Sequence, residues 1–238
     1  MKVLIACEFS GRVRDAFRAR GHDAWSCDLL PAMNGVESFS SKYAFYHFRQ
    51  DVLEILYDSC WDLLIAHPPC TYLCNSGVCR LYNKDHTHVK ERWKKMIEGA
   101  IFFRTFLCSG IPKICVENPV MHRYALDHIG ENYTQTIQPY QFGENASKRT
   151  CLWLKGLSPL KQTKVIEPEY ACKCGHRFEY ALGKYGCPNC NGDSGSARAI
   201  WANQTPGGQN KLGPSPDRAK LRSITYKGIA NAMADQWG

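Results

Sequence analysis

The chain of 238 residues is long enough for one α/β domain with a small appendage, and its hydrophobic content of 44% suits a globular protein. Its apolar runs are too short for a signal peptide or for the roughly 18 apolar residues of a membrane span, so we expect an intracellular protein without a membrane partner. Thirteen cysteines, an odd count in a chain that is not short, favour reduced thiols and metal ligands over a disulfide scaffold.

The net charge of +8 is unevenly distributed along the sequence. Residues 1–146 contain sixteen Lys and Arg against sixteen Asp and Glu, whereas residues 147–222 contain thirteen against five. This local positive charge suits a polyanion such as nucleic acid, and a basic surface that faces only solvent is the alternative interpretation.

Apolar runs alternate along the first part of the chain in the manner of an α/β fold. In chain order, we expect a strand at 2–7, a helix at 11–20, a strand at 24–27, a helical stretch at 52–57, a strand at 63–66, a helix at 87–107 and a strand at 114–116. The inner face of the first helix carries Val13, Ala16 and Phe17, and that of the second long helix Val89, Trp93, Met96, Ile97, Ile101 and Phe102. Antiparallel strands at 135–138 and 151–154 and a closing helix at 226–237 follow.

Periodicity breaks down between the later strands and the closing helix, where Gly, Pro, Asn and Ser cluster. We therefore expect a core at residues 1–158, a basic insert and mobile arm at 159–222, and a C-terminal helix at 223–238 that returns to the core.

Within the insert, cysteines form two close pairs. One residue separates Cys172 from Cys174, two separate Cys187 from Cys190, and a segment of hairpin length joins the pairs. Two such pairs fit a structural zinc ribbon with four thiolates, in which the metal supplies folding energy that a small module cannot obtain from a core, although the first pair has one intervening residue instead of the usual two. His176 in place of one cysteine, or four unligated thiols, are the alternatives.

Cys70 and Glu117 follow two of the expected strands. Pro68 and Pro69 end the strand at 63–66 and present the Cys70 thiol at a rigid turn. Because both residues would face the crevice at the carboxyl ends of the strands, Cys70 is a candidate nucleophile and Glu117 its carboxyl partner. A buried thiol and a solvated acid are the alternative.

The loop after the first strand contains Glu8, Phe9, Ser10 and Gly11, and Asp28 ends the second strand. An acid at that place suits the ribose hydroxyls of an adenosine-bearing cofactor. The glycine-rich phosphate fingerprint is absent, which favours a smaller, phosphate-free cofactor over a dinucleotide. A purely structural turn is the alternative.

The order of these motifs resembles the cytosine-5 DNA methyltransferase family. The Phe9-Ser10-Gly11 turn resembles the family's S-adenosylmethionine loop, Asp28 resembles its ribose-binding acid, and Asp51 resembles the acid near the adenine. Pro69-Cys70 resembles the catalytic proline-cysteine motif, and Pro68 before it falls at the cofactor pocket. Glu117-Asn118-Pro119 is similar to Glu-Asn-Val, Ser147-Lys148-Arg149 falls at the place of Gln-x-Arg-x-Arg, and the segment containing Asn231 resembles the closing Gly-Asn-Ala-Val segment.

This resemblance implies an α/β, Rossmann-like, S-adenosylmethionine-dependent methyltransferase sheet with a small zinc-ribbon insert in place of a large target-recognition domain. Cys70 would add to carbon 6 of cytosine, Glu117 would hydrogen-bond N3 and the amino group, and Arg149 would support the carbonyl oxygen. DNA is the implied partner, with short or loose sequence specificity, and the implied setting is the cytoplasm of a prokaryotic or phage-infected cell, with a monomeric protein.

Two positions depart from the family pattern. Ser147 stands for the glutamine and Cys151 for the second arginine of Gln-x-Arg-x-Arg, so the contacts to the target base differ. The same chemistry on a free cytidine nucleotide is one alternative. A catalytically silent nucleic-acid-binding protein, with the zinc ribbon as its contact module, is an alternative of another class.

Overall fold

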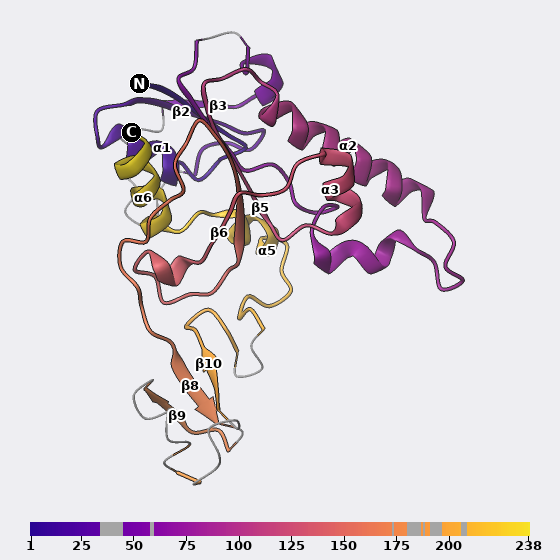
Figure 1. The fold of residues 1–238 in the computed structure, drawn as a ribbon, viewed down its shortest axis with the longest axis vertical. Helices are drawn as coiled ribbons and strands as arrows, with labels where there is room; N and C mark the ends of the chain where they lie inside the picture. Colours follow the sequence, from indigo (N-terminus) through magenta and orange to yellow (C-terminus); the bar gives the residue numbers. More distant parts are fainter. Residues whose placement is uncertain are drawn as a thin grey trace.

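The computed structural model describes residues 1–33, 45–57, 60–172, 174–179, 187, 189–190, 197–205 and 209–238. Its main body is a seven-stranded sheet in the order β3-β2-β1-β4-β5-β7-β6, with helices on both faces (Figure 1). The first five of these strands are parallel, and β7 runs antiparallel to both of its neighbours. The structure thus confirms the predicted Rossmann-like α/β fold class.

The strands of the main sheet are β1 (Lys2–Ala6), β2 (Asp23–Cys27), β3 (His47–Phe48), β4 (Leu63–Ala66), β5 (Lys113–Pro119), β6 (Gln135–Ile137) and β7 (Thr150–Lys155). The helices are α1 (Arg12–Arg18), α2 (Lys90–Leu107), α3 (Arg123–Ile129), α5 (Arg218–Ser223) and α6 (Lys227–Trp237), with 3-10 turns η2 (Val52–Glu54), η3 (Asn75–Leu81) and η4 (Pro139–Gln141). None of the helices in the described ranges has the length and apolar character needed to cross a membrane.

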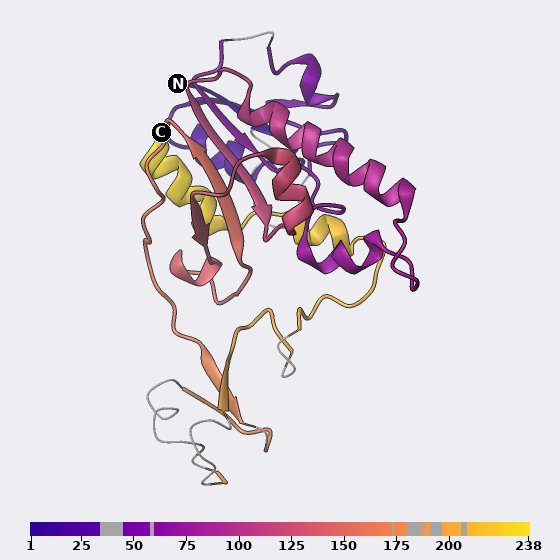
Figure 2. The ribbon, with the colours of Figure 1, turned by 45° about the vertical axis from the view of Figure 1, so that its right-hand side comes forward.

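Side-chain alternation along the strands produces two apolar layers. On β1, Val3 and Ile5 pack with α1 and α6, whereas Leu4 and Ala6 pack with α2 and α3. Figure 2 shows these helix pairs on opposite sides of the sheet. The predicted inner residues of α1 are buried, so the helical periodicity located that face correctly.

The inner face of α2 differs from the prediction. Its buried residues are Met96, Ala100, Phe103, Phe106 and Leu107. Ile101, expected inside, has 61% of its surface exposed, because it lies off the stripe formed by positions 96, 100, 103 and 107. The helix begins at Lys90 instead of residue 87, since Tyr82 and His88 form an antiparallel bridge just before it.

Strand β5 is longer than predicted. The sequence indicated a strand that ends at Val116, but β7 pairs with β5 as far as Pro119, opposite Thr150. Glu117 therefore lies within the strand and not after it. Pairing between segments distant in the sequence overrode the local signal for a strand end.

A second, antiparallel sheet lies in the stretch where the sequence indicated no regular elements. It consists of β8 (Glu169–Cys172), β9 (Arg177–Glu179) and β10 (Ala197–Ile200), in the order β10-β8-β9. Figures 1 and 2 both show it projecting away from the main sheet. Much of the expected hairpin between the two cysteine pairs lies outside the described residues.

Candidate active site and cysteine cluster

Two loops leave the main sheet side by side at its topological switch point. The chain passes from β1 to β2 on one side and returns later to β4 on the other, so Ala6 pairs with both Cys27 and Ala66. The His67 amide continues this pairing by donating to the Ala6 carbonyl at 2.9 Å. The loops after β1 and β4 thus flank the position at which open α/β sheets bind their ligands.

The loop that carries Cys70 is fastened to β5. The buried Asn118 side chain donates a hydrogen bond from Nδ2 to the Pro68 carbonyl at 2.9 Å. This bond fixes the Pro-Pro-Cys turn against the strand that carries Glu117. The structure thereby brings together the thiol and the carboxyl group that the sequence singled out.

Several neighbours act on the half-buried Cys70 thiol. Its pKa is raised, first by a hydrogen bond with Cys74, then by burial and by the nearby charge of Glu117, while the charge of Lys148 lowers it. The Cys74 sulfur also lies 3.1 Å from the Ser76 hydroxyl, so Cys74 is the more acidic thiol of the pair. The resting form of Cys70 is therefore the thiol, and its ionisation depends on the groups around it.

Glu117 has a partner that sequence reasoning missed. His67 Nδ1 lies 2.9 Å from Glu117 Oε2, and the two side chains are only 7% and 13% exposed. Burial raises the pKa of Glu117, but the hydrogen bond from His67 and the charges of Lys148 and His67 outweigh it, so the pKa is lowered overall. Glu117 is therefore an ionised carboxylate. The available sequence signal was a histidine directly before the Pro-Pro-Cys motif.

Lys148 and Arg149 precede β7, and their charges affect the pKa values of different residues. The charge of Lys148 lowers the pKa of both Cys70 and Glu117. Arg149 is exposed, and its charge partly offsets the burial that raises the pKa of Cys151 to about 11. A contact of Arg149 with substrate stays a prediction, and Lys148 is a second functional candidate that the sequence motif did not single out.

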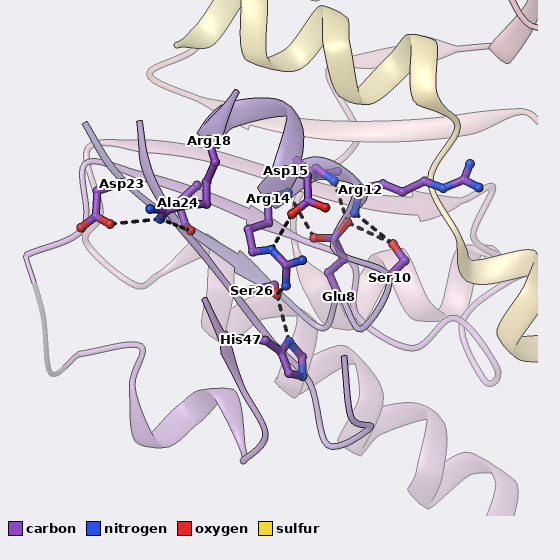
Figure 3. Close-up of polar contacts among 11 residues, drawn as sticks. Glu8, Ser10, Arg12, Arg14, Asp15, Arg18, Asp23, Ala24, Ser26 and His47 are labelled. Carbon is purple, nitrogen blue, oxygen red and sulfur yellow. Dashed lines mark hydrogen bonds and ion pairs between the residues drawn. The ribbon is translucent and has the colours of Figure 1, made fainter. Parts of the chain in front are cut away.

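Glu8 organises the loop after β1. Its buried carboxylate accepts hydrogen bonds from the Ser10 hydroxyl at 3.2 Å and from the amides of Val13 at 2.8 Å and Arg14 at 3.3 Å (Figure 3). A phosphate held at this turn would need the same amides. The protein's own carboxylate thus takes the place of a phosphate, in agreement with the missing phosphate fingerprint.

Arg14 fills the space beneath this loop. Its guanidinium donates to Asp15 at 2.7 Å and to the Ser26 hydroxyl at 2.9 Å, and Ser26 in turn contacts His47 at 2.9 Å (Figure 3). A Cβ atom on Gly11 would lie 2.2 Å from Arg14 Nη2, and Gly11 has a φ of 71°. The positive φ therefore favours glycine at the turn, and a Cβ atom there would also displace the Arg14 guanidinium.

The other residues predicted to hold the cofactor lie around these loops. Asp28 accepts a hydrogen bond from the Leu30 amide at 2.9 Å, and Asp51 accepts one from the Leu53 amide at 3.0 Å. Asp28 follows β2 and Asp51 lies after the neighbouring parallel strand β3, so both acids lie at the carboxyl edge of the sheet; their charges add to the burial that raises the pKa of Cys27 to about 12. Phe9 and Ser10 are buried in the β1–α1 loop, whereas Asn231 is exposed on α6.

The four insert cysteines form one cluster. Their Sγ atoms lie within 4.8 Å of one another, with Cys172 and Cys190 3.6 Å apart and Cys174 and Cys187 also 3.6 Å apart. A tetrahedral zinc ion with bonds of about 2.3 Å requires sulfur atoms about 3.8 Å apart. Both the donor set and the spacing fit zinc.

His176 and Cys174 support this arrangement in different ways. The His176 ring stacks on Phe178, and its carbonyl accepts a hydrogen bond from the Cys172 amide at 2.9 Å, so within the described part of the arm the cluster consists of cysteines. Hydrogen bonds from the His176 backbone and from the other three cysteines outweigh the effect of burial and lower the pKa of Cys174 to about 7. An acidic thiol at this position favours metal ligation.

Comparisons with known proteins give only distant likenesses. No family model matches the chain, and no curated protein matches its sequence. An E. coli prophage structure described as a DNA modification methyltransferase has 14% identity and a TM-score of 0.39, over 64% of this chain and 45% of that one. A mutant of DNMT2 from Spodoptera frugiperda has 16% identity and a TM-score of 0.35, over 69% and 54%. This chain spans about half the length of either protein.

Proposed function

We propose that this protein transfers a methyl group from S-adenosylmethionine to carbon 5 of cytosine in DNA through a covalent adduct of Cys70. The observation that carries this proposal is the pairing of a thiol on a rigid turn with a buried, ionised Glu117 at the switch point of the sheet. The ordered motifs from Phe9 to Asn231, which resemble the cytosine-5 DNA methyltransferases, support it.

The chemistry follows from the weak nucleophilicity of cytosine carbon 5. Ionised Cys70 adds to carbon 6, and the π electron pair of the carbon 5–carbon 6 bond becomes available at carbon 5, which can then form the bond to the methyl group. The Glu117 carboxylate accepts a hydrogen bond from the amino group of the base, and a second one from N3 once that nitrogen takes up a proton from solvent as the adduct forms; Arg149 supports the carbonyl oxygen as charge develops there. After methylation, loss of the carbon 5 proton and expulsion of the Cys70 thiolate release 5-methylcytosine.

S-adenosylmethionine supplies the methyl group. The residues that would hold it are Phe9, Ser10, Gly11, Asp28, Asp51, Pro68 and Asn231. Glu8 supports a cofactor of this kind, because its carboxylate occupies the amides at the start of α1 and S-adenosylmethionine carries no phosphate. The cysteine cluster is proposed to bind one structural zinc ion.

DNA is the proposed substrate because of the charge on the insert and on the segment just before it. Residues 147–222 carry an excess of eight positive charges, which suits phosphate contacts along a nucleic acid. In duplex DNA the target cytosine must leave the base stack to reach Cys70. With so small an insert, we propose short or loose sequence specificity.

The proposal is tested by transfer of a labelled methyl group from S-adenosylmethionine to unmodified DNA, with the product resolved at single bases. We expect label on carbon 5 of cytosine, its loss in Cys70→Ser, and its retention in Cys79→Ser, which changes an exposed thiol nine residues further on. Label on free cytidine nucleotides but not on DNA would identify a nucleotide substrate. Salt-dependent DNA binding without label on any substrate would identify a silent binding protein.

A further inference from the structure

Asn203 lies in the segment that leads from the small sheet back to the core, and its side chain hydrogen-bonds the main chain of Ser147. The Asn203 side chain accepts a hydrogen bond from the Ser147 amide at 3.0 Å and donates one to the Ser147 carbonyl at 2.9 Å. The two residues are 56 positions apart in the sequence. Because one side chain satisfies both polar groups of one residue, it fixes the position and the orientation of that segment.

The residues just before Asn203 anchor it to the core. Trp201, only 8% exposed, stacks on Tyr140 with the ring centroids 4.3 Å apart and the planes at 8°. The amide of Ala202 donates to Asn145 Oδ1 at 3.0 Å. Three consecutive residues of the insert therefore dock on the loop that leads to Ser147.

Lys148 is held from the other side as well. Its amide donates to Gln138 Oε1 at 2.9 Å, and its ammonium donates to the Arg222 carbonyl at 3.0 Å. Gln138 belongs to the core, whereas Arg222 lies in α5 at the end of the insert. Both the backbone and the charged end of Lys148 thus have fixed positions.

This clamped segment borders the candidate active site. It precedes Thr150, which pairs with Pro119, two residues beyond Glu117 on β5. The groups that act on Cys70 are Cys74 from its own loop, Glu117 from β5 and Lys148, and of these only Lys148 favours the thiolate over the thiol.

We propose that Asn203 is a positioning residue that, by clamping Ser147, holds Lys148 where its positive charge acts on Cys70 and Glu117, and so couples the cysteine-bearing insert to the nucleophile. The role of this coupling in catalysis rests on the proposed function, whereas the contacts of Asn203 and Lys148 do not depend on it. The insert thereby helps to set the ionisation of Cys70 in addition to contacting DNA.

The test is the rate at which iodoacetamide alkylates Cys70 at a series of pH values, resolved by mass spectrometry, with the exposed Cys108 as internal reference. Lys148→Met removes the cation and should slow alkylation of Cys70 at a given pH by roughly three- to tenfold. Asn203→Ala should shift the pH profile in the same direction. Asn210→Ala, which removes a side-chain oxygen that accepts a hydrogen bond from the nearby Leu212 amide at 2.8 Å, should leave the profile unchanged.

A Cys70 profile in Asn203→Ala that overlays that of the unaltered protein would overturn the proposal, as would an unchanged profile in Lys148→Met or an equal shift in Asn210→Ala. Unfolding would expose Cys70 and accelerate its alkylation, which is opposite to the predicted change. Because alkylation needs neither cofactor nor DNA, its outcome is independent of the methyl-transfer assay.

Discussion

Glu117 is buried and yet ionised because His67, three residues before Cys70, donates a hydrogen bond to its carboxylate. Neither the sequence pattern nor the family resemblance singled out this histidine. Its Nε2 atom is buried without a hydrogen-bond partner among the described residues, so the ring is held by the Glu117 contact on one side only. His67 therefore holds the carboxylate that is proposed to bind cytosine.

Replacing His67 should change the pH dependence of methyl transfer. The hydrogen bond lowers the pKa of Glu117, so His67→Ala raises that pKa and Glu117 takes up a proton at higher pH. If the carboxylate binds the base, the acid limb of the pH–rate profile should move upward by about one unit. The matched control is His128→Ala, which removes an exposed histidine from α3. If the acid limb does not move in His67→Ala, His67 does not control the ionisation of Glu117 during catalysis.

Residue types and spacing predicted Cys70 and Glu117, but not their surroundings. The two prolines and the flanking apolar runs are local signals, and the structure brings both residues to the switch point of the sheet. The role of Glu8 depends on the path of the backbone around it, and that of Lys148 depends on contacts with segments that are distant in sequence. Such contacts leave no periodic signal in a single sequence.

Among the secondary-structure elements, those with a strong apolar pattern were predicted well. β1, α1 and β4 lie within two residues of their expected bounds, because each has a clear apolar pattern, and Gly or Pro lies close to the ends of α1 and β4. The extension of β5 was missed because it depends on pairing with β7. The small sheet was missed because few apolar residues mark it: among the described residues its cluster consists of Cys172, Phe178 and Cys187, with Tyr170 packed against them.

Because the small sheet has few apolar contacts, we expect its stability to depend on a bound metal. One zinc ion per chain should be bound, and Cys174→Ser should lower this stoichiometry while Cys108→Ser does not. Removing zinc should make the arm sensitive to proteolysis yet leave the circular dichroism of the core nearly unchanged, because the main sheet has its own two apolar layers. Metal analysis combined with limited proteolysis checks both points. Full zinc content in Cys174→Ser would remove this cysteine from the ligand set.

For the molecule as a whole, the separation of charge predicts how it binds DNA. The first 146 residues are electrically balanced, so phosphate contacts should come mainly from the basic insert. The double variant Lys211→Gln and Arg218→Gln should reduce the slope of log affinity against log salt by about one for each phosphate that is no longer neutralised. Lys113→Gln, at the amino end of β5 and away from the site, is the control. Equal slopes in the unaltered protein, the double variant and Lys113→Gln would show that Lys211 and Arg218 do not contact the DNA.

The covalent step itself can be trapped on DNA that contains 5-fluorocytosine, in the presence of S-adenosylmethionine. Fluorine at carbon 5 cannot leave as the proton does, so the thiol adduct persists. We expect a stable complex in which mass spectrometry locates the DNA on Cys70, and no complex with Cys70→Ser. An adduct on Cys74, or DNA binding without any adduct, would contradict the proposed role of Cys70 as the nucleophile.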